Sequence, residues 1–81
     1  MSYYKDIQLA NKFIDEELLR VKNNNESITW NTFLLSVTAD FPVSQKHIIA
    51  RVNMHEKTGL IKFKLDENKE EIICRGDKYD S

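Results

Sequence analysis

The residues best suited to chemistry in this 81-residue chain are its two histidines and its one cysteine. His47 and His55 are eight positions apart, which on a helix separates them by about 80° around the axis. A metal ion would need a further nitrogen, sulfur or carboxylate ligand converging on both, and Cys74 belongs to a different predicted element. We therefore expect neither a metal site nor a cofactor.

Two further groups bear on catalysis. Ser44 lies three residues before His47, but no acid is placed to orient that histidine, and a helix-capping role explains the serine. The acidic run at residues 15–17 is typical of a solvated helix face. With two glycines in the chain, there is no phosphate-binding loop. The sequence thus predicts a protein that is not an enzyme.

Charge is distributed unevenly along the chain, although the formal net charge is only −1. Residues 44–64 carry five lysines and arginines against one acid, whereas residues 65–81 carry three against six. Screening limits exposed charges to a range of about 8–10 Å, so a local patch matters more for phosphate binding than the total charge does. The basic segment therefore favours a nucleic-acid partner.

Hydrophobic periodicity predicts three helices that would position these residues. Apolar side chains recur every three or four positions near the N-terminus and stack on one face. Thr29 and Ser44 are the expected N-caps of the next two helices, Pro42 stops the second, and Gly59 ends the third. The predicted helices cover residues of about 3–22, 30–41 and 44–58. The expected buried face of the second helix consists of Trp30, Phe33, Leu34, Val37 and Phe41.

After Gly59 the hydrophobic period changes to two, which is typical of a strand. Ile61, Phe63 and Leu65 fall on one side of this strand, with the lysines between them on the other. A polar turn and a second apolar run complete a predicted β-hairpin over about residues 60–75. Residues 27–29 are too short to predict a strand alone, though they could pair with one elsewhere. The chain is expected to form one domain over residues 1–81, because so short a chain supports a single core.

The third predicted helix has an inner and an outer side. Ile48, Val52 and His55 align on the side expected to face the core. The opposite, outward side carries Lys46, Ala50, Asn53 and Lys57, and Gln45, His47 and Arg51 flank it.

The stretches ITWNTFLLSVTADFPVS, HIIARV and EKTGLIKFKLDENKEEII resemble the winged helix-turn-helix family in element order and spacing. The resemblance implies an α+β, mainly α fold of three helices with a C-terminal β-hairpin wing. It also implies that the third helix lies in a DNA major groove while the hairpin touches the backbone or minor groove. On that basis the chain is expected to bind double-stranded DNA sequence-specifically, as a small transcriptional regulator. The expected groove contacts are Gln45, Lys46, His47, Arg51 and Asn53, and the expected phosphate contacts are Lys57, Lys62 and Lys64.

Two features favour a protein partner instead. The hairpin tip at residues 66–71 carries four acids and one lysine, which would repel a DNA backbone. The exposed face of the third helix is more apolar than is usual for a helix that binds a DNA groove, because it carries Ile49, Ala50 and Met54. The alternative function is therefore a winged-helix protein-interaction module, an accessory subunit of a transcription or replication assembly, with Ile49 and Met54 in its interface.

Leu9 and Phe13 widen the apolar stripe of the first helix. Either they pack under the hairpin or the second helix, or they form a two-fold homodimer interface that presents two third helices to a palindromic site.

The chain has no apolar run approaching the ~20 residues that span a bilayer, and no basic-then-apolar signal peptide. The lone cysteine excludes an internal disulfide and suits a reducing interior. We expect a cytoplasmic protein, nucleoid-associated if it binds DNA, without membrane contact.

Overall fold

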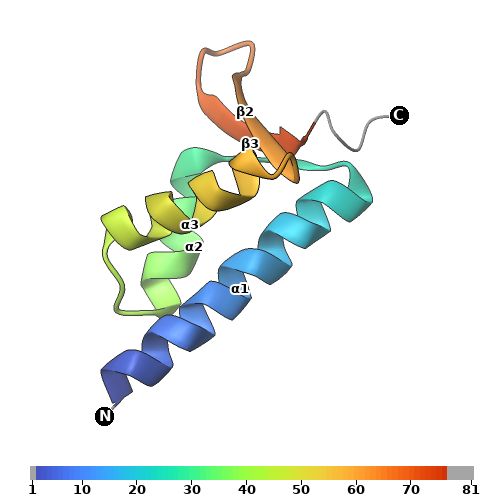
Figure 1. Cartoon of the computed structure of the whole chain (residues 1–81). Coiled ribbons are helices and arrows are strands. Elements are labelled where there is room, and N and C mark those ends of the chain that lie inside the picture. The colour runs from blue at the N-terminus through green and yellow to red at the C-terminus, as the bar shows by residue number, and fades with distance from the viewer. Residues whose placement is uncertain (1, 77–81) are drawn as a thin grey trace.

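The computed structural model describes residues 2–76, with residues 2–4 described by their backbone alone. The elements follow in the order α1 (Ser2–Asn24), β1 (Ser27–Thr29), α2 (Trp30–Asp40), α3 (Gln45–Lys57), β2 (Ile61–Leu65) and β3 (Glu71–Arg75) (Figure 1). The fold is α+β and mainly α, with the three helices and C-terminal hairpin of a winged-helix layout. The predicted fold class is confirmed.

The helix boundaries agree with the predicted capping residues. The Thr29 hydroxyl accepts a hydrogen bond from the Thr32 amide, and the Ser44 hydroxyl accepts one from the His47 amide, each at 3.2 Å. Helix α1 runs two residues further than predicted. It is followed by Asn25, whose φ of 52° lies in the left-handed region that asparagine tolerates.

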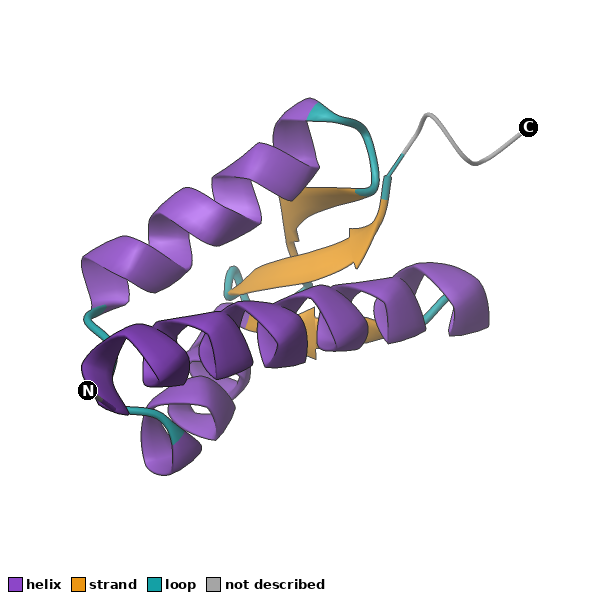
Figure 2. Ribbon diagram, turned by 60° about the horizontal axis from the view of Figure 1, so that its bottom comes forward, coloured by secondary structure: helices purple, strands orange, loops and turns teal. Residues whose placement is uncertain are grey.

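Strand β1 is the element whose formation the sequence alone did not predict. It pairs antiparallel with β3, placing Ile28 opposite Ile73, and gives a three-stranded sheet in the order β1-β3-β2. All three helices contact the sheet, and Ile28, Phe63 and Ile73, which lie opposite one another across its three strands, share one core with them. Figure 2 shows the sheet beside α1 and α3. Residues 27–29 form a strand because β2 pairs with one edge of β3 and the other edge of β3 is free to pair with them.

The core lies where the three helices meet the sheet. Ile48 and Val52 are fully buried, as predicted for the inner side of α3. Phe33 and Val37 of α2 are also buried, whereas Trp30 is only half-buried at the core's edge. Among residues 5–76, the buried residues of the central core cluster are Ile14, Leu18, Phe33, Val37, Ile48, Val52, Ile61 and Ile73.

The chain's two glycines meet at the base of the hairpin. Gly59 has a φ of 86°, a left-handed conformation that ends α3 at low cost only for glycine. A Cβ atom on Gly76 would lie 2.0 Å from the Gly59 carbonyl oxygen. Gly76 also donates its amide to the Leu60 carbonyl at 3.0 Å. This close approach fixes the hairpin against the end of α3.

Candidate binding site on helix α3

Helix α3 presents three stripes of side chains to its surroundings. Because each residue turns the helix by about 100°, residues three or four apart share a stripe. His47, Arg51 and His55 form the stripe beside α1, and Ile49, Asn53 and Glu56 form the stripe beside the hairpin. Between them runs an exposed crest of Lys46, Ala50 and Lys57.

The stripe beside α1 is joined to that helix by ionic hydrogen bonds. Arg51 donates from Nε to Oδ1 of Asp15 at 3.1 Å and from Nη2 to Oδ2 at 2.6 Å. His55 Nε2 lies 2.7 Å from the same Oδ1. His55 was predicted to face the core with Ile48 and Val52. It lies instead at the core's edge, where its ring reaches a carboxylate that the sequence pattern did not pair with it.

The electrostatics of Asp15 follow from these contacts. Burial alone would raise the pKa of this carboxyl group. The hydrogen bonds that Arg51 and His55 make to Asp15, with the electrostatic attraction of both groups, outweigh burial and hold the pKa of Asp15 below its usual value. The hydrogen bond to Asp15 in turn raises the pKa of Arg51. Asp15 therefore stays ionised and paired at neutral pH.

His47 extends the same network by one turn. Its Nε2 lies 2.8 Å from the Asn11 side-chain oxygen, and both residues are half-buried. A shallow hollow of about 210 Å³ lies over this end of the α1–α3 contact, with Met54 at its rim. Two of the residues predicted to enter a DNA groove, His47 and Arg51, thus point toward α1.

The other predicted DNA contacts lie on two further surfaces. Gln45, Lys46, Asn53 and Lys57 are exposed along α3. The alternation of β2 turns its lysines away from the side occupied by Phe63, so Lys62 and Lys64 lie on the far face of the hairpin. The eight predicted positions therefore do not form one continuous surface, and their contact with DNA stays a prediction.

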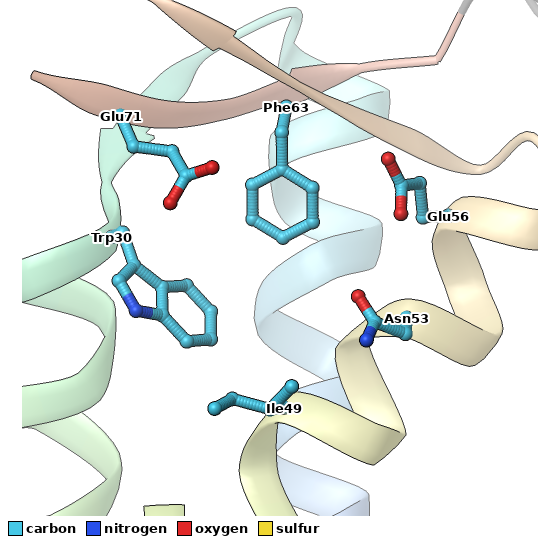
Figure 3. Close-up of a pocket in the computed structure, with 6 residues that line it drawn as sticks. All are labelled: Trp30, Ile49, Asn53, Glu56, Phe63 and Glu71. Carbon is cyan, nitrogen blue, oxygen red and sulfur yellow. The ribbon is translucent and has the colours of Figure 1, made fainter.

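The stripe beside the hairpin opens into a pocket of about 370 Å³ (Figure 3). Trp30, Ile49 and Phe63 supply its apolar walls, and the rings of Trp30 and Phe63 meet edge to face with centroids 5.7 Å apart. Asn53 projects from α3 at one side. The pocket thus draws together the start of α2, the middle of α3 and the hairpin.

Two carboxylates complete this pocket. Figure 3 shows Glu71 of β3 and Glu56 of α3 on opposite sides of the Phe63 ring, both directed toward the pocket. Both side chains are exposed, and neither forms an ion pair with another residue of the described range 5–76. The sequence did not predict this grouping, because nothing local to β3 or α2 indicates which part of α3 they will face.

The apolar residues predicted for a protein interface differ in their exposure and lie on two helices. Ile49 and Met54 are each 42% exposed and flank the crest of α3. Leu9 on α1 is 46% exposed, whereas Phe13 is half-buried, with its ring 5.5 Å from that of Phe41 at the end of α2.

The described residues contain no group of three histidine, cysteine or acidic side chains arranged to hold a metal ion. Within the same part of the chain, no helix is both long and apolar enough to cross a membrane. No protein-family model, curated protein or solved structure matches the chain.

Proposed function

We propose that this chain is a non-catalytic protein-interaction module of winged-helix layout, an accessory subunit that binds a partner polypeptide across helix α3. One observation carries the proposal. On the solvent-facing part of α3, an apolar ridge adjoins a pocket with aromatic walls. The only arginine of α3, Arg51, is hydrogen-bonded to Asp15 of α1.

The ridge consists of Ile49, Ala50 and Met54, which cross the crest of α3 from the hairpin pocket to the hollow beside α1. Protein interfaces are enriched in aromatic side chains and methionine at their centres, surrounded by a polar rim. Trp30 and Phe63 provide aromatic anchors beside this ridge. A partner segment lying across α3 would contact all of these groups.

The charges around α3 also favour a protein over DNA. Arg51 is neutralised by Asp15, and Lys62 and Lys64 lie on the far face of the hairpin. The surface near the pocket keeps Lys46 and Lys57 but adds Glu56 and Glu71. DNA affinity depends on the number of phosphates neutralised, and this balance offers few net positive charges.

Sequence-specific binding of double-stranded DNA, by a small transcriptional regulator, is the second candidate function. It is favoured by Lys46 and Lys57, which share the crest of α3 and lie about 16 Å apart along the axis at ~1.5 Å per residue. Gln45 and Asn53 lie beside them, with amide groups able to read an adenine edge.

Two measurements separate these functions. The first is fluorescence anisotropy with duplex DNA across a salt series, in which we expect no affinity that falls steeply with salt. The second is selection of displayed random peptides on the wild-type chain. We expect enriched peptides that lose binding to Met54→Asp. DNA binding that weakens with salt and on Lys46→Ala, without peptide enrichment, would instead support the regulator.

Homodimerisation through α1 depends chiefly on Leu9, since Phe13 packs against Phe41. Light scattering at high micromolar concentration tests it. A dimer that dissociates on Leu9→Asp would identify α1 as a second interface.

A further inference from the structure

The pocket between α3 and the hairpin combines two chemical features in one space. Its walls are aromatic, from Trp30 and Phe63, and its two sides carry the carboxylates of Glu56 and Glu71 (Figure 3). An aromatic face attracts a cation through its quadrupole, and a carboxylate attracts the same cation through its charge. Both features therefore select the same kind of ligand group.

We propose that this pocket receives an arginine side chain of the partner polypeptide, an assignment that rests on the proposed function and names the chemistry of the partner. The planar guanidinium stacks on an indole ring and presents several N–H donors in its plane. In this pocket the Trp30 ring supplies the stacking face, and Glu56 and Glu71 accept from opposite sides. The Asn53 side-chain oxygen is a further acceptor at the pocket's edge.

The charge arrangement explains why the occupant is cationic. Glu56 and Glu71 are exposed and have no ionic partner among residues 5–76. An apolar occupant would remove water from both carboxylates without replacing their hydrogen bonds, which is unfavourable. A guanidinium replaces those hydrogen bonds while its alkyl stem contacts Ile49 and Phe63. Charge complementarity therefore favours arginine over leucine or a phosphate-bearing group.

The pocket also carries its own reporter. Trp30 is the only tryptophan of the chain and forms one wall. Its fluorescence can be followed while N-acetylargininamide is added, with N-acetylnorleucinamide as the uncharged probe of similar length. We expect a saturable change with the arginine probe and none with the norleucine probe.

The deciding variant is Glu56→Gln/Glu71→Gln, which removes both pocket charges with little change in shape. Its matched control is Glu67→Gln/Glu70→Gln, which removes the same charge from exposed positions in the hairpin turn. We expect the pocket variant to weaken the arginine probe and arginine-containing selected peptides by at least fivefold, and the control by less than twofold. Circular dichroism verifies that both variants remain folded.

Two outcomes would overturn the arginine assignment. One is an equal response of Trp30 to both probes. The other is a set of selected peptides that lack arginine and bind the pocket variant as tightly as the wild type. The second outcome leaves the proposed protein-binding function standing, because peptides still bind across α3, and the first concerns the arginine assignment alone. That function fails separately, if no peptide is enriched at all.

Discussion

The two sides of helix α3 treat their charged residues in opposite ways. Beside α1, Arg51 and His55 share the carboxylate of Asp15. Beside the hairpin, Glu56 and Glu71 face an apolar pocket without an ionic partner in the described range 5–76. Charges that pack between two elements must be paired, so the first side belongs to the fold. The second side stays solvated and is available to a ligand.

This difference shows how a basic segment can be misjudged as a binding surface. Counted along the sequence, residues 44–64 are strongly basic. In three dimensions, one of those bases is paired with α1 and two lie on the far face of the hairpin. A charge contributes to recognition only when its neighbours in space leave it unpaired and facing the ligand.

The largest expected effect concerns the contact that holds the hairpin beside α3. Gly76→Ala should lower the free energy of unfolding by about 2–3 kcal/mol, because the new Cβ would overlap the Gly59 carbonyl oxygen. Urea unfolding measures the loss. Ser27→Ala, at an exposed strand position, is the control and should change stability by less than about 0.5 kcal/mol. Equal stabilities of the two variants would contradict the close glycine approach.

Breaking the ionic side of α3 should have the next largest effect. Asp15→Ala leaves Arg51 and His55 without their shared acceptor and should cost about 1–2 kcal/mol, since this half-buried pair is only partly screened by solvent. Glu16→Ala, an exposed neighbour on α1, should be close to neutral. Chemical unfolding of both variants provides the comparison. A neutral Asp15→Ala would mean that the network contributes nothing to the fold.

A paired experiment tests whether the two sides have separate roles. Ile49→Asn should weaken selected peptides by tenfold or more, about 1.4 kcal/mol, because it removes the apolar contact without adding a charge beside Glu56 and Glu71. It should change stability little, because Ile49 lies at the surface with 42% of its area exposed. Arg51→Met should do the reverse, lowering stability while leaving peptide affinity within twofold. Affinity and unfolding are measured on the same samples. If Arg51→Met impaired binding as much as Ile49→Asn, the division between the sides would be wrong.

The smallest expected effect is a pH dependence of stability. The pKa of folded Asp15 lies below its ordinary value of 3.8, so between the two values the unfolded chain binds more protons. The contribution of Asp15 is therefore present above pH ~4 and lost as pH falls through the folded pKa. We expect the stability difference between wild type and Asp15→Asn to shrink below that pH in urea titrations. A stability difference that grows on acidification would contradict a lowered pKa of Asp15 in the folded chain.

Much of the fold could be read from local signals. Ser44 and Thr29 cap helices through bonds to residues three positions on, and Pro42 and Gly59 act through their own backbone restrictions. These effects are local, so the sequence contains them directly. Strand β1 could not be predicted with the same ease, because three residues become a strand only beside the free edge of β3.

The candidate site depended much more on the tertiary structure. The sequence by itself determined that α3 buries Ile48 and Val52 and turns Lys46 and Lys57 outward, since the helical repeat alone decides those sides. Only the folded chain decided that Asp15, 36 residues away in sequence, takes Arg51. It also placed Glu71 and Trp30 beside Ile49. Periodicity reports which side of an element is buried, whereas the partner on each side is set by how distant elements pack.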